Sequence, residues 1–74
     1  MLISKITDDA WDWIMGALDR GFKCDVKGSI RLYIKEKYGE LIEKEYGSMS
    51  DSFISLTVDK LYRSVKKREV YYNA

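Results

Sequence analysis

Apolar side chains recur at helical spacing through residues 50–68, and this stretch gives the clearest structural signal in the chain. With Ser50 as N-cap and Asp51 in the first turn, the start of a helix is well defined. Positions i, i+4, i+7 and i+11 form one apolar face, which we expect to be buried: Ile54, Val58, Leu61 and Val65. The opposite face is polar and basic, with one apolar exception: Ser52, Ser55, Leu56, Asp59, Lys60, Arg63 and Lys67.

A second helix is expected to begin at Thr7 and to end before Gly21. Thr7 suits an N-cap, and Ile6 and Trp11 stand at the two positions of a hydrophobic staple. Glycine readily adopts the left-handed conformation that ends many helices, which suits Gly21. The expected buried stripe of this helix has four members: Trp11, Ile14, Met15 and Leu18.

Trp13 does not belong to that stripe. It lies about 160° from Trp11 around the helix, on the side of Ala10, Ala17 and Arg20. Ten aromatic residues (two Trp, six Tyr and two Phe) exceed what one small core buries, so some are expected at the surface. Because Trp, Tyr and Arg dominate protein–protein hot spots, we expect Trp13 and Arg20 to contact a protein partner.

Residues 22–28 read as a connection to a further helix, with Asp25 or Ser29 as its cap. From this point four apolar residues fall on one side: Ile30, Tyr33, Ile34 and Leu41. The pattern therefore predicts a helix over the middle of the chain.

Gly39 leaves the length of this middle helix open. A glycine inside a helix costs about 1 kcal/mol, so a break or kink near Gly39 is the favoured prediction. In the alternative, the helix continues to Tyr46 and Gly47 ends it.

The terminal segments 2–6 and 69–74 carry weaker signals. Residues 2–6 are expected as a short strand or an extended arm, and 69–74 as a strand pairing with them or as frayed helix. The 74 residues form one domain, 1–74, with little room for a second core. The predicted fold is mainly α, a compact bundle of three to four short helices, with short terminal strands as a minor component.

Charge and cysteine content exclude several classes of function. The net charge is +1, a balance that argues against a dedicated nucleic-acid binder. The chain has no histidine and only Cys24, so it offers neither a disulfide nor the usual zinc ligands. We expect no catalytic residues, no metal and no cofactor. A single free cysteine and the absence of a signal-like or membrane-spanning segment favour the cytoplasm and argue against a membrane partner.

The charges are nevertheless unevenly distributed. Residues 1–19 carry four aspartates against one lysine, and residues 60–68 carry five basic side chains and no acid. Because basic side chains bind phosphates, this local patch keeps nucleic acid as an alternative partner.

Residues 40–61 can be laid on a helix-turn-helix unit. A short helix over 40–46, Gly47 in the turn and the helix from Ser50 onward would place a recognition helix on DNA. The candidate DNA-contacting residues under this alternative are Ser52, Ser55, Lys60, Arg63 and Lys67.

The segment Leu56-Thr57-Val58-Asp59-Lys60-Leu61-Tyr62 resembles the L-T-M-N-K-L-Y stretch of the Hha/YmoA family. That family consists of small helical bacterial proteins that modulate gene silencing by docking on a nucleoid-structuring partner. The resemblance implies a helical fold and a protein partner. Where the family carries an Asp-His-Arg triplet used in partner contact, this chain has Ser50-Asp51-Ser52, so those contacts are not implied here.

Taken together, the sequence favours a small non-catalytic regulatory or inhibitory protein that binds a protein partner stoichiometrically. Inhibitors of this size, including those that phages and plasmids encode against host defence or transcription machinery, act by covering a surface. The expected partner-binding residues are Trp13, Arg20, Leu56, Lys60, Arg63 and Lys67. The alternative is the helix-turn-helix DNA-binding regulator, and a third reading is a self-assembling structural subunit, for example a homodimer.

Overall fold

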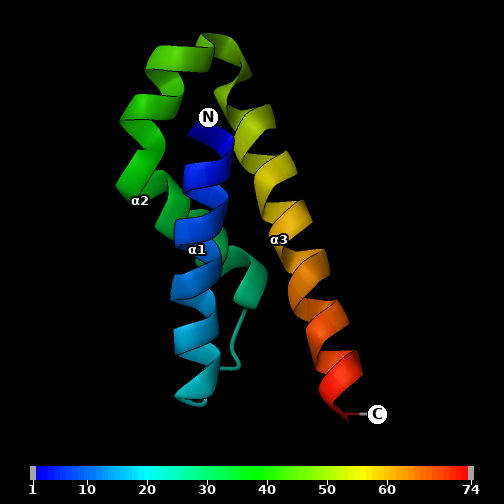
Figure 1. The fold of residues 1–74 in the computed structure, drawn as a ribbon. Coiled ribbons are helices and arrows are strands. Elements are labelled where there is room, and N and C mark those ends of the chain that lie inside the picture. Colours follow the sequence, from blue (N-terminus) through cyan, green and yellow to red (C-terminus); the bar gives the residue numbers. More distant parts are fainter. Residues whose placement is uncertain (1, 74) are drawn as a thin grey trace.

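The structure is a computed structural model that describes the backbone of residues 2–73 and the side chains of residues 3–67. Its elements are α1 (Leu2–Asp19), α2 (Val26–Tyr46), the 3₁₀ turn η1 (Gly47–Met49) and α3 (Ser50–Asn73). In Figure 1, α1 and α3 run downward and α2 returns upward, and the body measures 41 × 20 × 18 Å. The prediction of a mainly α fold is confirmed. The predicted terminal strands are wrong, because the described backbone is helical at both ends.

α1 begins at Leu2, well before the expected start after Thr7. Leu2–Ile6 is helical rather than extended, and Thr7 lies inside the helix, where its hydroxyl donates to the Ile3 carbonyl at 2.6 Å. Thr7 is therefore not an N-cap. The earlier start follows from Ile6, which is fully buried and extends the apolar face of the helix toward its N-terminus.

The buried stripe of α1 differs from the predicted one. Ile14 is shared by both, whereas Trp11, Met15 and Leu18 are only half-buried and pack at the edge of the core. The observed stripe alternates isoleucine with alanine: Ile6, Ala10, Ile14 and Ala17. Trp11, Met15 and Leu18 each follow a stripe residue by one position, so they lie together on one side of the stripe, against the edge of the core.

Gly21 ends α1 as predicted. Its φ is +93°, and its N–H donates to the Leu18 carbonyl at 3.0 Å. The Phe22 N–H donates to the Ala17 carbonyl at 3.1 Å, which completes a Schellman motif. The chain turns back here and enters the connection to α2.

Asp25 is the cap of α2, one of the two residues expected for this role. It adopts a left-handed conformation (φ 37°, ψ 61°), and its side chain accepts a hydrogen bond from the Gly28 N–H at 3.2 Å. The carbonyl of Asp25 also accepts from the Ser29 N–H at 2.9 Å.

α2 continues without a break through Gly39, so a break at this position is wrong, and the alternative of a helix that runs to Tyr46 is confirmed. The helix ends at Gly47, which has φ +55° and donates its N–H to the Glu43 carbonyl. The cost of a helical glycine is offset because the residues on both sides of it are buried in one core: Ile30, Ile34, Tyr38 and Ile42. Leu41, which was predicted on this face, is 42% exposed instead.

α3 carries the predicted core face. All four expected residues are buried, and Thr57 joins them, donating its hydroxyl to the Phe53 carbonyl at 2.8 Å. Ser50 is already helical (φ −60°, ψ −42°), so its predicted role as N-cap is wrong. The reason is η1, which leads from α2 directly into α3 and leaves no extended residue at this position.

The last residues extend α3 rather than form a strand. The backbone is helical as far as Asn73. The side chains of Val70, Tyr71 and Tyr72 lie outside the described residues.

We expect Gly39→Ala to raise the free energy of unfolding by roughly 0.5–1 kcal/mol, because alanine lowers the entropy of the unfolded chain and favours the helix. A Cβ at Gly39 meets no atom within 4 Å, so no clash opposes the gain. Chemical denaturation of both proteins measures the change. Gly47→Ala serves as the control and should destabilise the protein, because φ is +55° at Gly47. A loss of stability in Gly39→Ala would contradict the unbroken α2.

Leu61→Ala should lower the free energy of unfolding by about 2–5 kcal/mol, as truncation of a buried leucine does. Leu61 is 2% exposed, whereas Leu56 on the same helix is 71% exposed. Leu56→Ala is therefore the matched control and should change stability by less than about 0.5 kcal/mol. Thermal or urea unfolding of both variants tests the assignment, and the reverse ranking would contradict it.

Candidate functional site

An open groove with a mainly apolar lining runs between α1 and α2. Its volume is about 560 Å³. The lining comes from the second half of α1, the turn after it and the first half of α2: Trp13, Ala17, Arg20, Phe22, Ser29, Leu32, Tyr33 and Glu36. Leu32 is 57% exposed, so a large apolar side chain of the groove lining is open to solvent.

The wall of the groove is an aromatic stack. Trp13 and Tyr33 lie with ring centroids 4.5 Å apart and planes inclined by 12°. Ala17, one turn after Trp13 on α1, is buried and also lines the groove. Trp13 is half-buried and packs against the core, so it is both a core-edge residue and a wall of the groove.

A polar cluster behind the stack ties α1 to α2. The Tyr33 hydroxyl donates to Asp9 Oδ1 at 3.1 Å, and the Tyr38 hydroxyl donates to Asp9 Oδ2. Lys37 Nζ lies 2.7 Å from Asp9 Oδ2 and donates to the Tyr33 hydroxyl at 3.2 Å. Tyr33 is thus held at its ring by Trp13 and at its hydroxyl by Asp9 and Lys37.

The contacts within this cluster lower the pKa of Asp9 and raise the pKa values of Lys37 and Tyr38. The hydrogen bonds from Lys37 and then Tyr38 hold the pKa of Asp9 below its ordinary value of 3.8. The same contact with Asp9 raises the pKa of Lys37, and the hydrogen bond to the Asp9 carboxylate raises the pKa of Tyr38. General acids and bases work best with a pKa near the working pH, so this cluster suits a structural role.

Two charges flank the groove. Arg20 follows the end of α1 at the Ser29 end of the groove, and Glu36 lies two turns further along α2. Within the described part of the chain, neither side chain takes part in a hydrogen bond or ion pair. The groove therefore has an apolar centre, with the unpaired cation of Arg20 at one end and the unpaired anion of Glu36 at the other.

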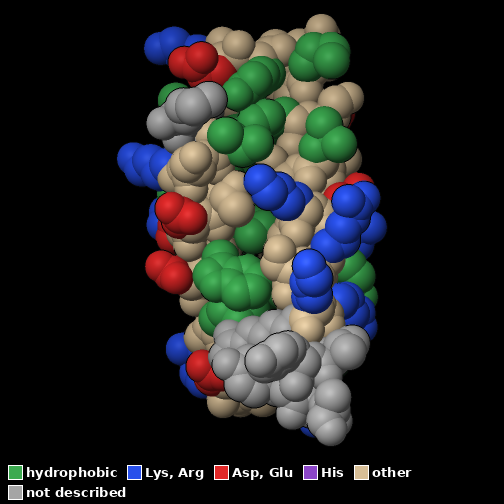
Figure 2. Space-filling model, turned by 45° about the vertical axis from the view of Figure 1, so that its right-hand side comes forward, with side chains coloured by type: hydrophobic (Ala, Val, Ile, Leu, Met, Phe, Trp, Pro, Cys, Tyr) green, Lys and Arg blue, Asp and Glu red, His purple; other side chains and the backbone are tan. Residues whose placement is uncertain are grey.

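The outward face of α3 is a second, separate surface. Five of the predicted residues are exposed, and Leu56 is 71% exposed: Ser52, Leu56, Lys60, Arg63 and Lys67. In Figure 2, which brings the α3 side of the molecule forward, Lys and Arg side chains gather toward the right-hand side of the view. Arg68, the next base, lies outside the described side chains. No residue of this face lines the groove, so Trp13 and Arg20 are not brought together with it.

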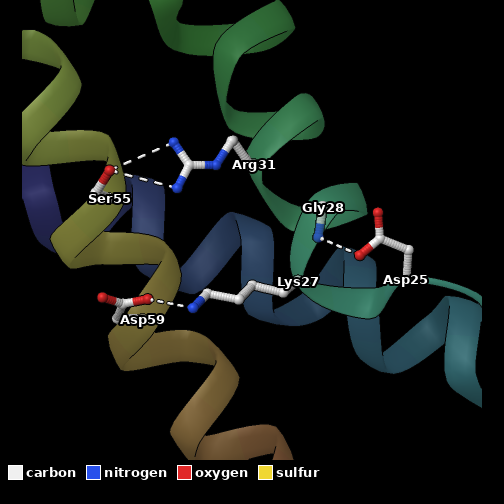
Figure 3. A network of polar contacts seen from close by, with 6 residues as sticks. All are labelled: Asp25, Lys27, Gly28, Arg31, Ser55 and Asp59. Carbon is white, nitrogen blue, oxygen red and sulfur yellow. Dashed lines mark hydrogen bonds and ion pairs between the residues drawn. The ribbon is translucent and has the colours of Figure 1, made fainter.

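Ser55 departs from the prediction that it faces outward. Its hydroxyl accepts from both terminal nitrogens of Arg31 on α2, at 3.3 and 3.4 Å. One turn further, Lys27 Nζ lies 2.9 Å from Asp59 Oδ1, and Figure 3 shows both contacts bridging α2 and α3. Ser55 is thus engaged between helices because α2 passes on that side of α3.

The short helix expected at 40–46 is the end of α2 and not a separate element. α2 and α3 lie against each other as a long antiparallel pair joined by η1 (Figure 1). The predicted bounds of the helix-turn-helix unit are therefore wrong, although Lys60, Arg63 and Lys67 remain on one exposed face.

Sequence reasoning found two groove residues, Trp13 and Arg20, and missed the contribution of α2. Leu32 carried a usable signal, because it is a large apolar residue outside the predicted stripe of its helix, as Trp13 is in α1. Tyr33 was assigned to the core, whereas it is half-buried and forms the wall of the groove. Glu36 gave no signal, since a lone glutamate on a helix is ordinary.

Among the described residues, no group of histidine, cysteine, aspartate and glutamate is arranged to hold a metal ion. None of the described helices has the length and apolar character needed to cross a membrane. Comparison of this chain with protein-family models, with curated proteins and with solved structures gives no match. The resemblance of residues 56–62 to the Hha/YmoA family stays a prediction.

We expect Asp9→Asn to lower the free energy of unfolding by roughly 1–2 kcal/mol at pH 7, because it removes a charged acceptor from three donors. The folded-state pKa of Asp9 is depressed, so its stabilisation is present above the unfolded pKa and is lost as the pH falls through the folded value. The thermal midpoint of the unsubstituted protein should therefore fall more steeply below about pH 4 than that of Asp9→Asn.

Asp8→Asn is the matched control for this experiment, since Asp8 is the exposed neighbour on the same helix. It should leave the midpoint at pH 7 nearly unchanged. Equal pH profiles for Asp9→Asn and the unsubstituted chain would contradict the role of the cluster.

Proposed function

We propose that this chain acts by stoichiometric binding of a protein partner in the groove between α1 and α2. The observation that supports this most is the combination of the exposed Leu32 with the stacked Trp13 and Tyr33 in one open groove. Aromatic side chains held rigidly lose little conformational entropy on binding, and this makes them effective anchors.

The form of the groove indicates the kind of ligand. A volume of about 560 Å³ with an apolar lining accommodates one or two large apolar side chains of a helix or loop. Arg20 at one end and Glu36 at the other offer a charged rim that orients the segment. We propose that the protein is a regulator or inhibitor that works by covering a surface of its partner in the cytoplasm, without catalysis.

DNA binding is a second candidate, supported by one observation. Lys60, Arg63 and Lys67 are all exposed on one face of α3, where they are free to meet phosphates. The acidic outward residues of α1, Asp8, Asp12 and Asp19, and the engagement of Ser55 reduce its support.

The test is affinity capture from nuclease-treated native lysate with three baits: the unsubstituted chain, Leu32→Glu and Leu41→Glu. Leu32 and Leu41 are both exposed leucines of α2, but only Leu32 lines the groove. A groove-bound protein should be retained by the unsubstituted and Leu41→Glu baits in near-stoichiometric amount. Leu32→Glu should lose it by more than about tenfold, since it introduces a charge into an apolar contact.

Circular dichroism of the three baits is the control for folding, and the three spectra should show the same helical content. Equal retention by Leu32→Glu and the unsubstituted chain would contradict the assignment of the groove. The unsubstituted bait is also used with lysate that has not been treated with nuclease, and a protein retained only from that lysate would favour the nucleic-acid alternative.

A further inference from the structure

Leu56 is the most exposed of the large apolar side chains in the described part of the chain, at 71%. Ser52 lies one turn before it and Lys60 one turn after it on α3, and both are exposed, Lys60 beside Thr7 and Asp8 of α1. We call Ser52, Leu56 and Lys60 the α3 ridge. No hydrogen bond or ion pair to the side chain of Ser52 or Lys60 is found within the described residues.

The groove of the same molecule presents a matching order along α2. Ser29, Leu32 and Glu36 follow one another at intervals of one turn, and all three line the groove. Leu32 and Glu36 are four residues apart, as are Leu56 and Lys60, so each pair spans about 6 Å along its helix. On α2 the apolar Leu32 is followed by the acidic Glu36, and on α3 the apolar Leu56 is followed at the same spacing by the basic Lys60.

The charges also select one orientation. With α3 of a second molecule running parallel to α2, Lys60 lies at Glu36 and the Ser52 hydroxyl lies at the end that Arg20 occupies. In the reversed orientation Lys60 would meet Arg20, and like charges in contact are unfavourable. Polar contacts therefore fix the register while Leu56 enters the apolar centre beside Trp13 and Leu32.

We propose that the groove of one copy binds the α3 ridge of a second copy of this chain, with Leu56 as the apolar anchor and Lys60 paired to Glu36. The groove and the ridge are different surfaces of the same molecule, so the contact is heterologous and leaves a free ridge and a free groove on the pair. Association then continues into open chains of copies. A contact of one helix in one groove is small, and we expect it to be weak and reversible.

Self-association and the proposed function compete for the same groove, so this part of the inference rests on the proposed function. A partner displaces the second copy, and the second copy keeps the groove covered when no partner is present. Leu56→Glu removes the ridge but leaves the groove intact, and we therefore expect this variant to capture the partner at least as well as the unsubstituted chain.

The test is sedimentation velocity of the full chain over concentrations up to the millimolar range, at low and high salt. The unsubstituted chain should sediment faster as its concentration rises, and less so at high salt, because the Lys60–Glu36 pair is screened. Leu56→Glu and Leu32→Glu should each remain monomeric, while Leu41→Glu should associate like the unsubstituted chain.

A mixture of the two monomeric variants gives the sharpest result. Leu56→Glu retains the groove and Leu32→Glu retains the ridge, so together they should form a 1:1 complex that does not grow further. Charge exchange adds a second arm: Glu36→Lys and Lys60→Glu should each weaken association at least tenfold, and the double variant should recover it.

Three outcomes overturn the proposal: a chain that is monomeric at every concentration, an association that Leu56→Glu leaves intact, and a mixture that fails to form the 1:1 complex. None of these outcomes affects capture of a different protein by the groove, so the proposed function is judged separately. Loss of partner capture by Leu32→Glu with no self-association would retain the proposed function and reject this inference.

Discussion

The aliphatic core shared by α1, α2 and α3 is the contact on which the other features depend. It is made of isoleucines on α1 and α2 facing Ile54, Val58, Leu61 and Val65 on α3. No disulfide is available to a chain with one cysteine, and a domain of this size buries little surface. Its stability therefore rests on this packing, and both surfaces described above are positioned by it.

The groove lies beside the core contact between α1 and α2, and the buried Ala17 forms part of its lining. Trp13 packs at the edge of the core, where it stacks on Tyr33. Asp9 then holds the tyrosine through its hydroxyl and recruits Lys37. The wall of the groove is thus rigid before any ligand arrives, which lowers the entropic cost of binding.

The charged side chains of this molecule fall into two groups: some form contacts between helices, and others have no partner within the described part of the chain. Between helices, Arg31 and Lys27 are engaged with Ser55 and Asp59, so they hold α2 against α3. Around the groove and on the α3 ridge, Glu36 and Lys60 have no partner among the described residues and are available for recognition. The first set contributes to the fold, and the second set supports the proposals of partner binding and self-association.

The sequence by itself determined the helical class, the ends of helices at Gly21 and Gly47, and the core face of α3. These follow from local chemistry, since glycine tolerates positive φ and an i, i+4, i+7 stripe has one face to bury. Only the tertiary structure decided the buried face of α1, the passage of α2 through Gly39 and the place of Ser55. Each depends on which helix lies alongside: the neighbouring helices cover Ala10 and Ala17 and leave Trp11 half-buried, and a continuous core outweighs the cost of a helical glycine. The groove was decided there too, because it is made by residues of two helices whose packing no local pattern encodes.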